Sequence, residues 1–358
     1  MINIKNYIFL LKKLLLFCAF CILLLVLFIA FILYTRSENY NIKTNGKLFV
    51  INKLGKSVTV FDLEKGKELA EIPLGTEPRE IVSFNDGKNV AFTNYGDNYL
   101  PGKSITILNV KNLANQKKIQ LTKGTRPYGI AALHKDYKLA TVTNGGNSFV
   151  ILNTKTDSVE TVIPTKEKIS HMLVLHPTKT IAYVTNRISG TVSVIDYKLQ
   201  KIIKTIKSGL GAEGIDITPN GDEIWVTNTL ENTISVINTT TYKVDETLIA
   251  GKEAYRLKFT LDGKHCIVTN AKDGTIYIFD RFTKYRIKTI MLNGKSSFLQ
   301  RVMYHSPRPV GITLHPNKKY AFIANSNADK VEVLNLNSLK VVSNINTGRV
   351  PDAMTIID

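Results

Sequence analysis

Hydrophobic and polar residues alternate in short blocks along most of the chain, and turn residues such as Gly, Pro, Asn and Asp separate the blocks. One stretch shows the pattern clearly: it predicts strands at 214–218, 223–228, 233–238 and 247–250, with a turn at 219–221. A unit of four such strands is too small to bury both of its faces. Neighbouring units must therefore stack on one another.

A block that ends in Asn recurs along the chain, usually as Thr-Asn or Ala-Asn. Its copies end at Asn52, Asn94, Asn144, Asn186, Asn228, Asn270 and Asn325. Successive copies are 42, 50, 42, 42, 42 and 55 residues apart. Because one four-stranded propeller blade has about this length, the repeat predicts an all-β fold, a seven-bladed β-propeller.

The two ends of the repeat region each lack part of a blade. Residues 47–52 read as a second strand without a first, whereas residues 353–357 read as a first strand without followers. We expect these strands to share one blade, because that arrangement closes the ring and leaves no open sheet edge.

The repeat resembles a known family. The match is closest where Tyr183-Val-Thr-Asn186 is followed by 190–196, and where Trp225-Val-Thr-Asn228 is followed by 233–238. These residues resemble the YVTN β-propeller repeat family, and the resemblance covers about residues 46–358. Propellers similar to it include surface-layer proteins, nucleic-acid binders, haem-carrying domains and lactonase-like enzymes. The resemblance therefore implies the fold and leaves the function open.

The N-terminal region has a different pattern. Residues 14–33 form a run of twenty residues without a charge, which at about 1.5 Å per residue spans the hydrocarbon core of a bilayer. The run is longer than the apolar part of a signal peptide and ends without a small-residue cleavage pattern, so we favour an uncleaved signal anchor. Cys18 and Cys21 each follow a Phe, which disfavours lipoprotein processing.

Charge flanking the apolar run predicts its orientation. Lys5, Lys12 and Lys13 precede the run, and positive residues stay on the cytoplasmic side. We therefore expect a cytoplasmic tail at 1–13, a membrane anchor at 14–34, a linker at 35–45 and an extracytoplasmic propeller at 46–358. Cys266 then has no partner cysteine in the propeller for a disulfide.

Two insertions distinguish individual copies of the repeat, at 95–103 and at 291–309. In a propeller both kinds of loop lie on the same face, which also carries the residues that begin each innermost strand. Loops on a rigid scaffold commonly carry binding residues, so this face is the predicted functional one. The residues expected to ring the channel there are Arg79, Glu80, Tyr128, Ser170, His171, Glu213, Tyr255, Arg256, Val310 and Asp352.

Three interpretations of this ring compete. In the first, the charges pair with one another around a water-filled channel. In the second, the ring and the two inserted loops bind a ligand, with Tyr128, Tyr255 and Arg256 as stacking and hydrogen-bonding groups. In the third, His171, Glu213, Glu80 and Asp352 hold a divalent metal ion for hydrolysis.

The sequence contains other candidate residues besides those of the ring. In the second insertion Arg301, His305 and Arg308 form a cluster suited to an anion, whereas His134, His176 and His315 recur in one turn position and indicate turn chemistry. We interpret the repeated Asn as a structural residue whose side chain bonds nearby backbone. Gly-x-Ser-x-Gly, His-Glu-x-x-His, phosphate-loop and haem-attachment motifs are absent from the sequence.

The formal net charge of +18 favours polyanionic partners. Because the lysines are scattered over all blades, anionic envelope polymers or lipid headgroups fit better than nucleic acid. The sequence thus favours a monomeric, membrane-anchored binding or scaffold propeller of the cell envelope, with an unidentified envelope protein or anionic polymer as partner and no cofactor. The alternatives are a metal-assisted, lactonase-like hydrolase outside the cytoplasm and a propeller that binds polyanions or nucleic acid.

Overall fold

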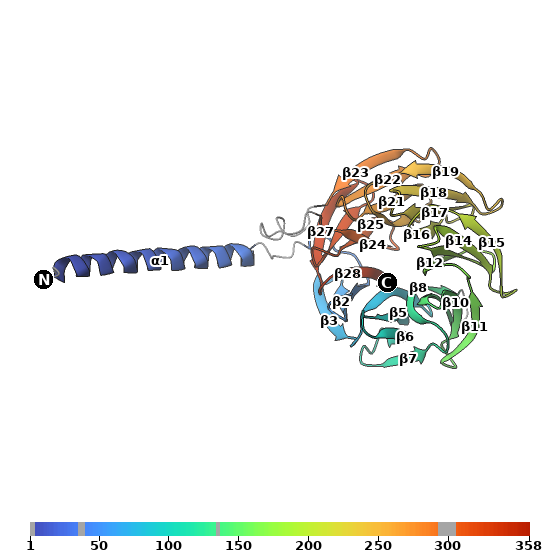
Figure 1. The fold of residues 1–358 in the computed structure, drawn as a ribbon, viewed down its shortest axis with the longest axis horizontal. Helices are drawn as coiled ribbons and strands as arrows, with labels where there is room; N and C mark the ends of the chain where they lie inside the picture. The colour runs from blue at the N-terminus through green and yellow to red at the C-terminus, as the bar shows by residue number, and fades with distance from the viewer. Residues whose placement is uncertain (1–3, 35–39, 134–136, 293–305) are drawn as a thin grey trace.

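A computed structural model describes residues 4–34, 40–133, 137–292 and 306–358. It contains one helix, α1 (Ile4–Tyr34), followed by a ring of β-sheets (Figure 1). The seven-bladed propeller predicted from the repeat is confirmed: the described residues form seven antiparallel sheets of four strands each.

Six of the sheets, blades B to G, are contiguous in sequence and run from the channel outward. Blade B is β4 (Pro78–Phe84), β5 (Asn89–Gly96), β6 (Pro101–Asn109) and β7 (Gln116–Gln120). Blade C is β8 (Thr125–Leu133), β9 (Lys138–Gly145), β10 (Ser148–Asn153) and β11 (Ser158–Pro164). Blade D is β12 (Ser170–Leu175), β13 (Ile181–Asn186), β14 (Thr191–Asp196) and β15 (Lys201–Lys207).

The other three contiguous blades follow the same order. Blade E is β16 (Ala212–Ile217), β17 (Glu223–Asn228), β18 (Thr233–Asn238) and β19 (Val244–Ile249). Blade F is β20 (Ala254–Phe259), β21 (His265–Asn270), β22 (Thr275–Asp280) and β23 (Arg286–Met291). Blade G is β24 (Pro309–Leu314), β25 (Tyr320–Asn325), β26 (Lys330–Asn335) and β27 (Lys340–Asn346).

Blade A joins the two ends of the propeller, as the sequence predicts. Its strand order is β28 (Pro351–Ile357), β1 (Lys47–Asn52), β2 (Ser57–Asp62) and β3 (Lys67–Pro73). β28 is the innermost strand, and Val50 of β1 pairs with Met354 in antiparallel register. Figure 1 shows the last strand lying beside the first ones, so the ring is closed by the chain ends.

Apolar residues from adjacent blades form the core. Trp225 of β17 is fully buried and packs edge-on against Phe259 of β20 and Phe279 of β22, which belong to the next blade. Similar clusters lie between other pairs of blades. Because this apolar surface is buried between blades and not within one, each blade needs its neighbours to fold, and folding of the ring is cooperative.

The repeated Asn is structural; most of its side-chain partners are hydroxyl groups, and the expected bond to nearby backbone is present at Asn270, whose Oδ1 accepts from Gly251 N at 3.0 Å. Asn186 Nδ2 donates to Thr191 Oγ1 at 3.1 Å and to Ser193 Oγ at 2.9 Å. Asn228 makes the same pair of bonds to Thr233 and Ser235. The register explains this: the Asn faces the first hydroxyl residue of the next strand, and the second lies two residues further on the same side.

The turn histidines behave as predicted where the structure describes them. His176 Nδ1 accepts hydrogen bonds from the backbone N–H groups of Thr178 and Lys179, each at 3.1 Å. His315 Nδ1 accepts in the same way from Asn317 N at 3.1 Å. His134 lies outside the described residues.

The segment just before the propeller packs on one of its faces. Tyr40 Oη donates to the carbonyl of Leu63 at 2.6 Å, and His315 Nε2 bonds the carbonyl of Asn45 at 2.9 Å. Ile42 is buried. Leu63 and His315 follow the ends of β2 and β24, so residues 40–45 lie on the face opposite to the one where innermost strands begin.

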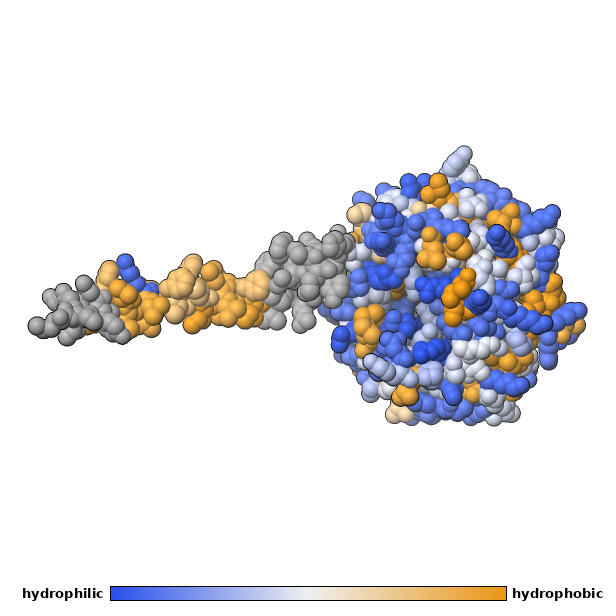
Figure 2. All heavy atoms as spheres, viewed as in Figure 1, coloured by the Kyte–Doolittle hydropathy of each residue, from blue (hydrophilic) through white to orange (hydrophobic). Residues whose placement is uncertain are grey.

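The helix α1 is apolar and lies apart from the ring (Figures 1 and 2). Its span Ile8–Ile29 has 22 residues and a mean hydropathy of 2.6, and none of it is buried in the protein. Figure 2 shows a nearly continuous apolar surface along this helix, whereas the propeller face in view is largely hydrophilic. Length and composition fit either a membrane anchor or a signal peptide.

Candidate functional site

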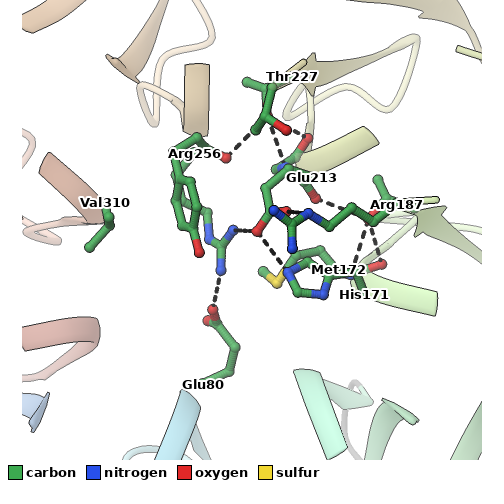
Figure 3. Close-up of polar contacts among 12 residues, drawn as sticks. Glu80, His171, Met172, Arg187, Glu213, Thr227, Arg256 and Val310 are labelled. Carbon is green, nitrogen blue, oxygen red and sulfur yellow. Dashed lines mark hydrogen bonds and ion pairs between the residues drawn. The ribbon is translucent and has the colours of Figure 1, made fainter. Parts of the chain in front are cut away.

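A buried group of charged side chains occupies the centre of the ring, and Figure 3 shows it. Glu213 of β16 is fully buried; its Oε1 lies 2.7 Å from His171 Nε2 and 3.1 Å from Arg256 Nη1. Arg256 Nη2 donates to Glu80 Oε1 at 2.7 Å. These residues come from the innermost strands of blades D, E, F and B, so only ring closure brings them together.

A β-bulge aims each of these side chains into the channel. In each innermost strand the register shifts where the charged residue lies, for example between Ala212 and Ile215 around Glu213. The same shift flanks His171, Arg256 and Glu80. A bulge re-orients a side chain and leaves a backbone group outside the ladder.

The Thr of the repeated Thr-Asn pair satisfies that backbone group. Thr227 Oγ1 accepts from the N–H of Gly214 at 2.9 Å, and Thr269 Oγ1 accepts from that of Arg256 at 3.1 Å. The hydroxyl also reaches the next blade, because Thr185 Oγ1 donates to the carbonyl of Glu213 at 2.9 Å. The repeat motif thus builds the bulge that carries the site residues.

The protonation states of the central pair follow from burial and charge. Burial opposes ionisation of Glu213, but His171, Arg256 and Arg187 outweigh it and hold its pKa at about 2. Burial lowers the pKa of His171, and Arg256 and Arg187 add to this effect against the pull of Glu213. At neutral pH we therefore assign a carboxylate to Glu213 and a neutral imidazole to His171.

The tautomer of His171 then follows from its contacts. Because Glu213 is ionised, His171 Nε2 carries the proton and donates to Oε1. His171 Nδ1 is left with a lone pair and lies 3.4 Å from Asn144 Nδ2. The imidazole is also held by Tyr128, whose ring centroid is 3.8 Å away. The basic nitrogen of His171 is thus fixed in orientation.

Glu80 differs from Glu213 in its protonation. Burial raises the pKa of Glu80 to about 7, although the guanidinium of Arg256 acts in the opposite direction. Glu80 and Arg256 belong to blades B and F, on opposite sides of the ring. Their contact therefore crosses the channel and separates two spaces. One, of about 370 Å³, has Glu80, Arg256 and mostly aliphatic residues in its wall.

The other space is a cleft of about 590 Å³ on the face where the innermost strands begin. Among the described residues, its lining includes four cationic side chains and no acidic one: Lys53, Arg79, Arg187 and Arg308. His171, Tyr128 and Tyr255 also line it. The cleft therefore presents a positive surface, and the His171 imidazole is part of its wall.

The carboxylates that pair with these cations do not line the cleft. Glu77 Oε2 lies 3.5 Å from Arg79 Nη2, and Glu253 binds both terminal nitrogens of Arg308, at 2.9 and 2.5 Å. Lys53 makes no ion pair with any described residue, and burial, followed by the charge of Arg79, lowers its pKa. An anion in the cleft would relieve this repulsion.

Arg187 covers the second oxygen of Glu213. Its Nε lies 2.8 Å from Glu213 Oε2, but the geometry is not that of a hydrogen bond, and Oε2 accepts none from the described residues. The Arg187 side chain is 46% exposed, whereas that of Glu213 is fully buried. Of the partners of Glu213 in the described part of the chain, Arg187 is therefore the one that extends toward solvent.

Most of the ring residues predicted from sequence lie at this centre or in the cleft. Arg79, Tyr128, His171, Tyr255 and Arg308 line the cleft. Glu80, Glu213 and Arg256 form the ion-pair centre below it, and Asp352 of β28 is buried and interacts electrostatically with Arg79 and Arg308. Arg301 and His305 lie outside the described residues, as does most of the second insertion.

Sequence reasoning missed two cationic cleft residues, Lys53 and Arg187, and the aliphatic residues of the lining, whereas Tyr95 belongs to the insertion predicted on this face. Lys53 and Arg187 directly follow the repeated Asn, at Asn52 and Asn186. The corresponding residues in other copies include Gly145, Thr229, Ala271 and Ser326, so variation at this position is the signal that could have revealed them. The first insertion contributes Tyr95 itself but mostly extends β5 and β6, which pair as far as Gly96 and Pro101.

The proposed divalent metal site does not fit the donor set. The guanidinium of Arg256 lies between Glu80 and Glu213, where such an ion would have to bind. Within the described ranges no three His, Cys, Asp or Glu residues are grouped to hold a metal. A bound cationic side chain replaces the ion in this arrangement.

Comparisons with known proteins agree with this fold. A family model described as "Lactonase, 7-bladed beta-propeller" matches residues 170–286, about a third of the chain. This segment includes His171, Arg187, Glu213 and Arg256. No curated protein sequence matches the chain. The YVTN assignment stays a prediction, because the matching family model is the lactonase one.

Solved structures of low sequence identity share the fold. A functionally unknown protein from Desulfotomaculum acetoxidans aligns with a TM-score of 0.70 at 15% identity, over 87% of this chain and 99% of its own. A putative 6-phosphogluconolactonase from Bacteroides uniformis aligns with a TM-score of 0.68 at 15% identity, over 88% and 100%. A periplasmic gluconolactonase from Pseudomonas aeruginosa aligns with a TM-score of 0.68 at 14% identity, over 87% and 99%.

Proposed function

We propose that this protein hydrolyses a lactone, with the reaction taking place above His171 in the cationic cleft. The observation that carries the proposal is the His171–Glu213 pair, a neutral imidazole held by a buried carboxylate at the floor of an accessible cleft. The lactonase family match supports it, because the matched segment contains this pair. Binding to an envelope protein or polymer, the function favoured by the sequence, has less support.

In the proposed mechanism, His171 is the general base. Its Nδ1 takes a proton from a water molecule, the water oxygen attacks the lactone carbonyl carbon, and the ring C–O bond then breaks. Glu213 orients the imidazole and stabilises the imidazolium that forms. The imidazolium then gives the proton to the departing alkoxide, which leaves a hydroxy acid as the product.

Arg187 stabilises the developing negative charge. It lies in the cleft wall, next to His171, and is the most exposed partner of Glu213. A guanidinium at this place can donate to the oxyanion formed from the lactone carbonyl. Arg256 has a different role, since its side chain is buried between Glu80 and Glu213 and holds Glu213 ionised.

The lining of the cleft favours a lactone that carries a phosphate or carboxylate. Lys53, Arg79 and Arg308 face the cleft, and their acidic partners lie outside its lining. Paired arginines held in this way keep free N–H groups for a bidentate anion contact. A neutral lactone would leave Lys53 without an ion pair to any described residue and would not use these N–H groups of the two arginines.

The location also belongs to the proposal. If α1 is an uncleaved anchor, Lys12 and Lys13 place its N-terminus in the cytoplasm and the propeller outside it. Residues 40–45 pack on the face opposite to the cleft. The cleft would then open away from the membrane that holds the anchor.

The test measures turnover of two δ-lactones by the full-length protein in lipid nanodiscs: 6-phosphogluconolactone and glucono-δ-lactone. We expect release of acid above the spontaneous rate, fastest with the phosphorylated lactone, and its loss in His171→Ala. His265→Asn, at the start of β21 and outside the cleft, is the matched control and should keep the wild-type rate. Turnover no faster than the spontaneous reaction, or equal in His171→Ala, would overturn the proposal and leave a binding function.

A further inference from the structure

The wall of the cleft is divided into a cationic sector and an apolar sector. The cations Arg308, Lys53 and Arg79 come from blades G, A and B, which are neighbours in the ring. Across the cleft, blades D and E contribute mainly aliphatic side chains to the lining, and Arg187 of blade D is the one cation on that side among the described residues. The aliphatic residues are Ile169, Ile188, Leu210 and Leu230.

A tyrosine lies at each boundary between the two sectors. Tyr128 belongs to blade C, between B and D, and Tyr255 belongs to blade F, between E and G. The guanidinium of Arg308 lies 6.0 Å from the ring centroid of Tyr255, and that of Arg79 lies 5.8 Å from that of Tyr128. Tyrosine suits such a boundary, because its ring is apolar and its hydroxyl is polar.

The aliphatic side chains are not needed for packing of the fold. Ile188, Leu210 and Leu230 are 63%, 55% and 73% exposed, and they project from the β13–β14, β15–β16 and β17–β18 loops. Single exposed aliphatic residues are common on protein surfaces. Three of them in the wall of one cleft, opposite three cations, form a surface that a ligand with one charged and one apolar end would cover.

We infer that the cleft takes an amphiphilic anion, whose phosphate or carboxylate binds Lys53, Arg79 and Arg308 and whose hydrocarbon part covers Ile188, Leu210 and Leu230. This inference rests on the proposed function only for the reacting group: in a substrate the lactone ring would lie between the two ends, above His171. It narrows the substrate class from polar sugar lactones to lactones that bear an apolar substituent.

The test uses anions that cannot be hydrolysed, so that binding is measured apart from turnover. Methyl, butyl and hexyl phosphate are titrated calorimetrically into the full-length protein in zwitterionic nanodiscs, with empty discs as reference. Since each buried methylene adds to binding, we expect hexyl phosphate to bind about tenfold or more tightly than methyl phosphate. Affinity that does not change with chain length would overturn the inference.

Variants assign the two ends of the ligand. Leu210→Ser with Leu230→Ser should remove the gain from chain length and leave methyl phosphate binding unchanged, whereas Lys53→Met should weaken all three phosphates. Leu199→Ser is the matched control, because Leu199 is 60% exposed in the β14–β15 turn on the opposite face. A chain-length gain that survives Leu210→Ser/Leu230→Ser, in a protein with unchanged thermal stability, would contradict the apolar sector.

A second arm identifies the source of the anion. Because the cleft opens away from the anchoring membrane in the proposed orientation, phosphatidylglycerol is added as separate vesicles; it should displace hexyl phosphate if the ligand is a membrane lipid, and should leave its binding unchanged if the ligand is diffusible. The outcome is separable from that of the lactonase test. Chain-length-dependent binding without turnover would support the inference alone, and turnover of sugar lactones without chain-length dependence would support the proposed function alone.

Discussion

Arg256 and Glu80 meet across the centre of the propeller, with Arg256 Nη2 2.7 Å from Glu80 Oε1 although 176 residues separate them in sequence. The contact links blades on opposite sides of the ring. It also connects Glu80 to Glu213, because Arg256 bonds both carboxylates. The interpretation in which ring charges pair with one another therefore describes the floor of the cleft, while the cations above it remain available to a ligand.

Replacing Glu80 should change how stability depends on pH. The pKa of Glu80 is raised to about 7 in the folded protein, above its usual 4.5, so its stabilising contribution is complete below pH 4.5 and is lost as pH rises through 7. Glu80→Gln removes this loss, which has a ceiling of about 3 kcal/mol. The difference in melting temperature, Glu80→Gln minus wild type, should therefore be larger at pH 8 than at pH 5. The exposed control Glu231→Gln should show a difference from wild type that does not change with pH. The same constant difference for Glu80→Gln would refute the assignment.

Replacing Glu213 should impair both stability and activity. Glu213→Gln leaves buried Arg256 with Glu80 as its only acidic partner among the described residues, at a cost of about 3–5 kcal/mol. Loss of the carboxylate behind His171 should also lower kcat by about 100-fold or more. The double variant Glu213→Gln/Arg256→Met should be less destabilised than the sum of the two single variants, since it leaves no uncompensated charge. Additive losses in thermal denaturation would mean that the two residues are not coupled.

The pH–rate profile should report the neutral imidazole of His171. Because burial lowers the pKa of His171 from its usual 6.5, the base should lose its lone pair only at lower pH. We expect kcat/KM to be constant around pH 7 and to fall on an acid limb centred below 6.5. An acid limb centred above 6.5 would contradict this, because it would require a group with a raised pKa as the base.

Removing the last strand should destabilise the whole ring. Deleting residues 353–358 removes most of β28, including buried Ala353, Met354 and Ile356, and exposes the edge of β1. The lost burial of about 1.5–3 kcal/mol per large side chain should lower the melting temperature by roughly 10 °C or more. Deletion of Asp358 alone is the control, since this exposed residue lies beyond β28. An unchanged melting temperature after the longer deletion would mean that the blade shared by the two ends does not hold the ring closed.

The fate of α1 can be read from the mass of the mature chain. An uncleaved anchor predicts a membrane-bound protein of 40.0 kDa that resists extraction at alkaline pH. A protein shortened by the apolar span Ile8–Ile29 and found in the soluble fraction would show that the span is a signal peptide.

Sequence patterns predicted the fold well because the repeat contains local information. Alternation gives the strands, the 42-residue period gives the blades, and β17 and β18 begin and end where the pattern of blade E predicts. The repeated Asn was recognisable as structural, but its partners and the role of the Thr before it were not. Thr227 bonds Gly214 within its blade and Tyr255 in the next, and such bonds depend on register and ring closure.

The site was predictable only in part. Residues at the start of each innermost strand were expected to face the channel, and His171, Glu213 and Tyr255 do so. Their partners could not be inferred, because a sequence does not say how far a side chain reaches across a closed ring. Arg187 was missed for this reason: it lies after a repeat Asn, yet its Nε comes within 2.8 Å of a carboxylate on the next blade.

By itself, the sequence determined which strands form, how many blades they make and that the chain ends share one blade, because periodicity and hydrogen-bonding capacity along the chain are local properties. Only the tertiary structure decided that Arg256 occupies the place proposed for a metal ion, that Glu80 and Glu213 differ in protonation, and that cations and aliphatic side chains face each other across the cleft. Those features depend on distance and burial between blades, and closing the ring sets both.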